Sequence, residues 1–213
     1  MSEWKKVKWE LQQDHKQIQG ELSLYCSVTA SQSHLPKLLD SFRHQYPQVE
    51  IKLSTGDPAL SASKVMQQEV DASIAIHTPD FPQELTFLPL GEVPLLLIAP
   101  KDTQLTRLSQ VDWREHSVIL PESGPSKRIV HHWFAEQGIR PRVYATVAGN
   151  EAIVSMVALG CGLGIVPEIV LDNSTISQRV NRIKLDDIEP YQIGLCCIRK
   201  RQSEPAIQAL FNC

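Results

Sequence analysis

The sequence lacks the long apolar segments that mark membrane and secreted proteins. Its most apolar run, Val93 to Ala99, is far shorter than the ~20 residues needed to cross a bilayer. The charged start, Met1 to Lys6, leads into polar sequence where a signal peptide would place an apolar stretch. We therefore expect a cytoplasmic protein with no membrane partner.

The sequence also lacks a surplus of basic residues and a metal-binding spacing of cysteines. Its 21 Lys and Arg against 24 Asp and Glu give a formal net charge of −3, which argues against nucleic-acid binding by this chain alone. Neighbours such as Cys196–Cys197 and His131–His132 point to different sides of a strand or helix and would not share one ion. No metal or cofactor is predicted. Reduced, mostly buried thiols are expected for Cys26, Cys161, Cys196, Cys197 and Cys213.

The chain does contain an amphipathic start. Residues 1–19 have neither Gly nor Pro, and their apolar residues form a heptad-like stripe that predicts a short helix ended by Gly20. The stripe consists of Trp4, Val7, Leu11 and Ile18. The whole length of 213 residues suffices for one large domain or two small lobes.

Beyond residue 20, short apolar runs alternate with helical stretches. Strands are expected at 21–27, 49–54 and 72–76, with helices at 35–46 and from 58 to about 68 between them. This order predicts a parallel sheet with right-handed crossovers, and therefore an α/β fold. Later strands are expected at 86–90, 94–99, 117–120, 143–147, 163–166, 181–184 and 191–199, and later helices at 127–137, 150–159 and 205–212.

Four strand–helix junctions carry small polar residues, at the end of a sheet where α/β proteins bind ligands. They lie at 27–31, 54–57, 122–126 and 146–151. Free backbone N–H groups at helix starts, joined by Ser and Thr hydroxyls, form an anion site that suits a small carboxylate. Helix capping alone explains the same residue types, so binding and capping both stay open. His77, at the end of an apolar strand, is either a ligand donor or an ordinary surface or core histidine.

Catalytic motifs are weak. Asp71, Asp80 and Glu84 offer no acid–base pair, and Cys26, at a strand end, has no assignable base. The glycine-rich stretch 160–164 lacks the Lys-Ser/Thr of a phosphate loop and is interpreted as a reversal between a helix and a buried strand. We therefore predict no catalytic residue and no enzyme activity.

Four segments carry a resemblance to a known family. They are GELSL at 20–24, LPKLLDSF at 35–42, VDASIAI at 70–76 and VALGCGLGIVP at 157–167. In these segments the chain resembles the effector-binding (regulatory) domain of LysR-type transcriptional regulators. The resemblance implies an α/β, periplasmic-binding-protein type II fold, with two Rossmann-like lobes joined by two crossover strands. It assigns 1–19 to the linker helix, 20–97 plus 192–213 to lobe I and 98–191 to lobe II.

The same resemblance implies an inducer in the cleft between the lobes. Stretches at 26–36, 49–57, 144–171 and 199–205 are closer still to family members that activate isoleucine–valine biosynthesis. A small carboxylate inducer is thus expected, of the acetohydroxy acid class that includes acetolactate and acetohydroxybutyrate. The implied effector-binding residues are Ser27, Val28, Thr29, Ala30, Thr55, Gly56, His77, Ser123, Gly124, Asn150 and Glu151, of which Val28 and Ala30 would contribute N–H groups.

The chain departs from the family pattern at its start, where nothing before residue 20 matches a winged helix-turn-helix. We therefore expect operator DNA to be bound only through a part absent from this chain. The family pattern also implies a homodimer, and a tetramer at full length, with helix 35–46 of one subunit against helix 127–137 of the other. Two alternatives stay open, a stand-alone small-anion or solute-binding protein of the same fold and a small-molecule enzyme.

Overall fold

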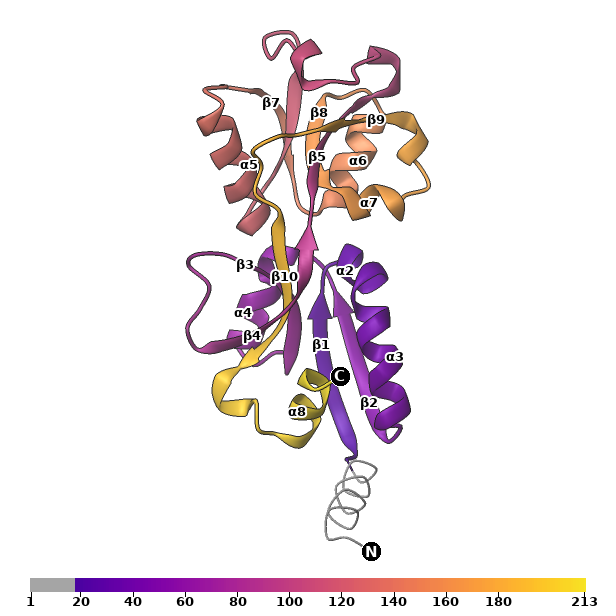
Figure 1. Ribbon diagram of the computed structural model, residues 1–213, viewed down its shortest axis with the longest axis vertical. Helices are drawn as coiled ribbons and strands as arrows, with labels where there is room; N and C mark the ends of the chain where they lie inside the picture. The colour runs from indigo at the N-terminus through magenta and orange to yellow at the C-terminus, as the bar shows by residue number, and fades with distance from the viewer. Residues whose placement is uncertain (1–17) are drawn as a thin grey trace, which may run out of the picture.

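Two five-stranded sheets lie one beyond the other along the long axis of the molecule in the computed structural model, which describes residues 18–213 (Figure 1). The first sheet has the strand order β2-β1-β3-β10-β4, and the second has the order β7-β6-β8-β5-β9. The stripe expected at Trp4, Val7 and Leu11 lies outside the described residues. In the part of the chain that the structure covers, no helix combines the length and apolar character that a membrane crossing requires.

The helices and strands follow the alternation expected from the sequence. The first half contains β1 (Gly20–Cys26), α2 (Val28–Ser33), α3 (Leu35–Gln45), β2 (Val49–Thr55), α4 (Ser61–Met66), β3 (Ala72–His77) and β4 (Leu85–Val93). The second contains β5 (Leu95–Pro100), β6 (Ser117–Pro121), α5 (Gly124–Glu136), β7 (Arg142–Val147), α6 (Asn150–Ala158), β8 (Leu163–Pro167), α7 (Glu168–Asp172) and β9 (Val180–Lys184). The chain then returns to the first half as β10 (Tyr191–Ile198) and α8 (Pro205–Phe211). Short 3₁₀ turns occur at η1 (Pro58–Leu60), η2 (Lys101–Thr103), η3 (Leu108–Gln110), η4 (Ser177–Arg179) and η5 (Arg199–Arg201).

The parallel pairing that the sequence predicts for the strands at 21–76 is confirmed, and antiparallel strands added to it make both sheets mixed. Strands β1, β2 and β3 pair in parallel, as do β6, β7 and β8. In contrast, β10 runs antiparallel to β3 and β4, and β5 runs antiparallel to β8 and β9. These two strands follow the connections that pass between the halves, at Pro94 and after β9, so they enter their sheets from the opposite end (Figure 1).

Apolar faces fix the helices on the sheets. In α3, Leu35, Leu38 and Phe42 recur at helical spacing and are buried, and Pro36 lies in the first turn. The largest buried cluster runs from these residues through the crossover strands to Trp133 of α5, so the packing is continuous between the halves. Separate clusters lie under α4 and α6.

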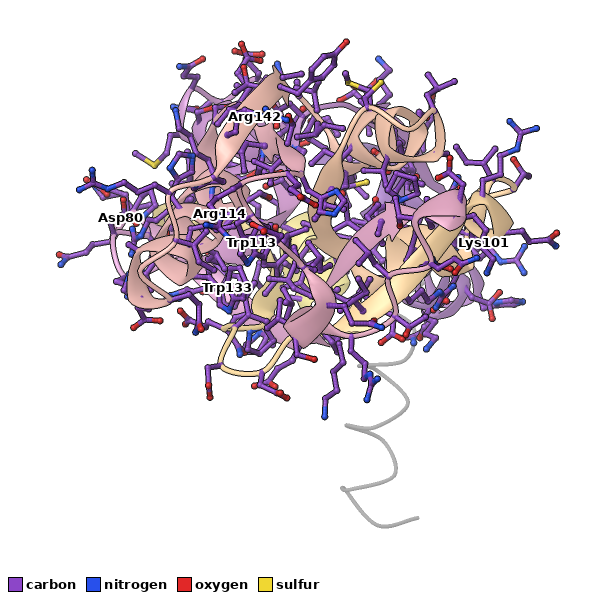
Figure 2. All side chains as sticks on the ribbon, turned by 90° about the horizontal axis from the view of Figure 1, so that it is seen from above. Asp80, Lys101, Trp113, Arg114, Trp133 and Arg142 are labelled. Carbon is purple, nitrogen blue, oxygen red and sulfur yellow. The ribbon has the colours of Figure 1, made fainter. Side chains whose placement is uncertain are left out.

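Aromatic side chains hold α5 in place on the second sheet. The Trp113 ring packs edge-on against Trp133 and Phe134, at centroid distances of 6.2 and 5.3 Å (Figure 2). The indole Nε1 of Trp133 donates to the Asp186 carbonyl oxygen at 3.3 Å. This packing fixes the direction of α5, whose N-terminus faces the first half.

Candidate functional site

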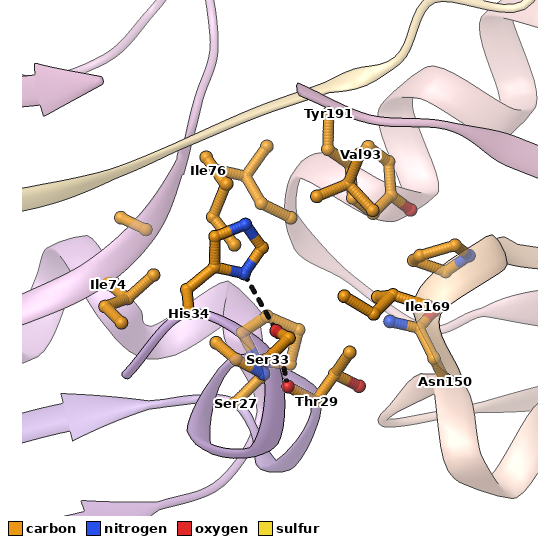
Figure 3. Close-up of a pocket in the computed structure, with 15 residues that line it drawn as sticks. Ser27, Thr29, Ser33, His34, Ile74, Ile76, Val93, Asn150, Ile169 and Tyr191 are labelled. Atoms are coloured by element: carbon orange, nitrogen blue, oxygen red, sulfur yellow. Dashed lines mark hydrogen bonds between the residues drawn. The ribbon is translucent and has the colours of Figure 1, made fainter. Parts of the chain in front are cut away.

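A small cavity lies between the two sheets, where β1 and β3 end (Figure 3). Its volume is about 30 Å³, close to the share of liquid volume of one water molecule. No Asp, Glu, Lys or Arg is found among its lining residues. They are Ser27, Thr29, Ala30, Ser33, His34, Pro58, Ile74, Ala75, Ile76, Val93, Asn150, Pro167, Ile169, Tyr191 and Ile193. We call this space the central cavity.

A second space, the side cavity, adjoins the central cavity at Pro58 and Asn150, which line both. It measures about 10 Å³ and lies against the N-termini of α5 and α6. There the Ser123 hydroxyl makes a long contact of 3.5 Å with the Asp57 carboxylate from the first half. Neither cavity has room for an organic acid as it stands, so the two halves must separate to admit one.

Contacts across the cleft hold this closed arrangement. The Thr29 hydroxyl donates to the Glu151 carboxylate at 2.5 Å. Arg128 of α5 forms a salt bridge of 2.5 Å with Asp80, which lies at the periphery of the molecule (Figure 2). Both partners of that salt bridge are well exposed, so it contributes at most ~1 kcal/mol. The Thr29–Glu151 hydrogen bond is therefore the closing contact next to the cavity.

The structure distinguishes the two interpretations of the polar junctions, because two junctions have a side-chain cap and two do not. The side chains of Ser27 and Asp57 are caps, accepting the N–H groups of Ala30 at 3.1 Å and Ala59 at 2.9 Å. The N-termini of α5 and α6 have no side-chain cap. Because the first N–H groups of a helix have no partner within it, these two ends are free to bind an anion.

Most of the residues implied by the resemblance lie at the cleft. Ser27, Thr29, Ala30 and Asn150 line the central cavity, and Ser123 and Asn150 line the side cavity. Glu151 contacts Thr29 from the opposite side. A Cβ on Gly124 would lie 2.4 Å from the Cβ of Ala59, so the two halves meet at this glycine.

The other implied residues do not line either cavity. Val28 is 39% exposed, and Thr55 is also exposed. Gly56 donates its N–H to the Cys26 carbonyl oxygen at 3.1 Å, which ties β2 to β1. His77 lies at the end of β3, where its ring stacks on Phe81 at a centroid distance of 5.0 Å and lies tilted against Phe87 at 4.9 Å.

Sequence reasoning missed His34 and Tyr191, which line the central cavity. His34 Nδ1 is paired with the Ser33 hydroxyl at 2.8 Å, and burial together with Lys37 lowers the pKa of His34. Tyr191 is 2% exposed, and its hydroxyl has no hydrogen-bond partner in the described structure. In the sequence, His34 is simply the residue before α3 and Tyr191 the first residue of β10. Only the tertiary fold shows that both lie at the cavity.

The cleft offers binding groups and no reactive pair. Cys26 is buried beside it, and burial raises the pKa of its thiol to about 11, so the nucleophilic thiolate is scarce at neutral pH. All five cysteines are free, as the sequence predicts. Among residues 18–213, no three His, Cys, Asp or Glu side chains gather where they could hold a metal ion.

Comparison with known proteins fits this geometry. Residues 15–213 match the family described as LysR substrate binding domain. The HTH-type transcriptional activator IlvY of Haemophilus influenzae is 39% identical over 214 residues, which are 98% of this chain and 73% of that protein.

Solved structures share the fold at low identity. The effector-binding domain of QuiR in complex with shikimate superposes with a TM-score of 0.79 at 18% identity, covering 92% of this chain and 95% of that one. The Synechocystis PCC6803 CcmR regulatory domain in complex with 2-PG gives 0.77 at 21%, covering 91% and 95%. The predicted periplasmic-binding-protein type II fold is thereby confirmed. The chain belongs to the LysR family of transcriptional regulators, as its effector-binding domain.

Proposed function

We propose that this chain senses the inducer of a LysR-type transcriptional activator of isoleucine–valine biosynthesis, and that the inducer is an acetohydroxy acid. The observation that carries the proposal is the central cavity, whose lining combines apolar walls with neutral polar groups and has no fixed charge. Such a lining suits a small ligand with apolar carbons and a few oxygen atoms. The likeness to IlvY activators supports the acetohydroxy acid class.

The inducer carboxylate binds, in this proposal, at the uncapped N-termini of α5 and α6. Their free N–H groups and the positive ends of the helix dipoles stabilise an anion without a basic side chain. QuiR and CcmR, which share the fold, are complexed with small molecules, and this supports a ligand site in the same fold here.

The signal is a change in the balance between open and closed cleft. An inducer shifts that balance only if it binds one arrangement more tightly than the other. A ligand that contacts Thr29 on one side and α6 on the other does so, because it bridges the halves in place of the direct Thr29–Glu151 contact. In a cytoplasmic full-length homodimer, this movement would be passed to a separate operator-binding part.

Titration calorimetry tests the proposal with freshly prepared acetolactate and acetohydroxybutyrate, compared with valine, isoleucine and sulfate. We expect saturable binding of the two acetohydroxy acids alone. Thr29→Val, which removes one hydroxyl at constant shape, should raise Kd about three- to tenfold. Thr86→Val is the matched control, since Thr86 bonds Gln202 on the first half. Absence of binding by either acid contradicts the inducer class, and an unchanged Kd in Thr29→Val contradicts the site.

A further inference from the structure

Two hydroxyl groups beside the cleft are buried without a hydrogen-bond partner. Tyr191, at the start of β10, is 2% exposed, and Ser126, in the first turn of α5, is 5% exposed. Neither side-chain oxygen meets the geometry of a hydrogen bond with a described residue, although the Tyr191 and Ser126 hydroxyls are close enough to interact with each other. Buried polar groups in folded proteins are nearly always paired, so such orphans point to a water or a ligand that completes them.

The two orphans lie where the cavities meet the second half. Tyr191 lines the central cavity and Ser126 lines the side cavity, and Asn150 lines both. The Asn150 side chain is itself buried and makes none of the hydrogen bonds found within residues 18–213. Figure 3 shows Tyr191 and Asn150 on the second-half side of the central cavity, across from His34. Three polar side chains without a hydrogen-bond partner thus lie where the two cavities adjoin.

The chemistry of these groups selects a neutral partner that both donates and accepts hydrogen bonds. Hydroxyl and amide side chains can do either. No charged side chain lines the central cavity, and the two that line the side cavity, Asp57 and Glu122, are acidic and disfavour an anion there. Burial raises the pKa of Tyr191, and the neighbouring Ser126 hydroxyl cancels only part of that increase. The phenol therefore stays protonated at neutral pH. An alcohol group meets these requirements at the three side chains and leaves the backbone N–H groups at the starts of α5 and α6 for the inducer carboxylate.

We propose that Tyr191, Ser126 and Asn150 form a neutral polar subsite that binds the hydroxyl group of the inducer. Tyr191 is the specificity-determining residue of this subsite, because it presents its hydroxyl from the apolar crossover strand. This inference rests on the proposed function, since it assumes that a hydroxylated acid occupies the cleft. It adds that the cleft rejects acids of the same shape that lack the hydroxyl.

The test pairs acetolactate with 2-methylacetoacetate, which has hydrogen in place of the hydroxyl. Wild type should bind acetolactate about 10- to 100-fold more tightly, because the deoxy acid leaves buried polar groups unpaired. Tyr191→Phe keeps the ring and removes the hydroxyl, and it should bring the two affinities within about threefold. Tyr46→Phe is the control, since Tyr46 is equally buried but lies at the end of α3, away from the cleft. It should keep the full preference.

Stability measurements separate a structural role from a binding role. Because the Tyr191 hydroxyl has no partner in the free protein, Tyr191→Phe should melt at the wild-type temperature or above it. Ser126→Ala is the second variant, and it should also reduce the preference for acetolactate. A lower melting temperature of Tyr191→Phe with the preference intact assigns the hydroxyl to folding and overturns the subsite.

The outcomes also distinguish the subsite from the proposed function. Equal wild-type affinities for the two acids, or a full preference in Tyr191→Phe, overturn the subsite and leave the proposed function standing. Wild-type protein that binds neither acid refutes the proposed function, and the subsite fails with it.

Discussion

Replacing Gly124 with alanine should keep the cleft from closing. Gly124 begins α5 with φ +71°, and a Cβ there would lie 2.4 Å from the Cβ and 2.8 Å from the Cα of Ala59, on the other side of the cleft. Carbon atoms in contact stay about 3.5–4.0 Å apart, so the two halves must move apart by roughly 1 Å or more. The Ala59 Cα belongs to the backbone, so no side-chain rotation relieves this overlap.

A matched control isolates the steric effect from the backbone effect. Gly138 has φ +66° and nothing within 4 Å of its Cβ position, so Gly138→Ala has the cost of the left-handed backbone alone, about 1–2 kcal/mol. Gly124→Ala has the same backbone cost plus an overlap penalty of about 1–3 kcal/mol that applies only to the closed form. Inducer binding, in which the two halves open to admit the acid and then close around it, should therefore weaken about 5- to 150-fold.

Three measurements on both variants check this prediction. Urea denaturation should show a similar loss of stability in each, while small-angle X-ray scattering should show a larger radius of gyration only in Gly124→Ala. Calorimetry should show weakened acetohydroxy acid binding in the same variant alone. Equal affinity and equal dimensions in Gly124→Ala and Gly138→Ala would refute the closed cleft as the binding form.

Two other changes test charges in the first half and at the cleft. Glu151→Gln removes an exposed negative charge that repels the inducer carboxylate beside it. Calorimetry should therefore show about two- to fivefold tighter binding of the inducer. Weaker binding would mean that Glu151 contacts the inducer favourably. Asp71→Asn should lower the free energy of unfolding at pH 7 by about 1–3 kcal/mol, because the Asp71 carboxylate accepts the N–H and hydroxyl of Ser23 and pairs with Arg201. Burial alone would raise the pKa of Asp71, but the Ser23 and Arg201 contacts outweigh it and lower that pKa. The stabilisation is therefore present above the Asp71 pKa of the unfolded chain, about 4, and is lost as the pH falls through the lower pKa of the folded protein. Urea titrations should show that the difference in the free energy of unfolding between wild type and Asp71→Asn narrows only below about pH 4.

The order of strands and helices was predictable from the sequence because each element carries its own periodic pattern. The short helix α2 was not, since its sequence VTASQS contains weak helix formers and depends on the Ser27 cap and on burial of Thr29 and Ala30. Strand direction in β5 and β10 was not predictable either. It is set by the passage of the chain between the halves, which no local pattern encodes.

The candidate site was predictable where a junction residue also faces the cleft, as Ser27, Thr29 and Asn150 do. His77 shows the limit of that reasoning. Residues 74–76 of β3 line the central cavity, whereas the His77 ring at the end of the strand packs against Phe81 and Phe87. Tyr191 lies far from Ser27 in sequence, and only the return of β10 between the halves brings it to the site.

The most direct test of the cleft as the inducer site is a crystal structure of this chain grown with acetohydroxybutyrate. We predict ligand density between the two sheets, with the carboxylate within hydrogen-bond distance of the N-terminal N–H groups of α5 and α6. The alcohol oxygen should face Tyr191. Density at another surface, with the Thr29–Glu151 contact still closed over an unchanged central cavity, would contradict the assignment.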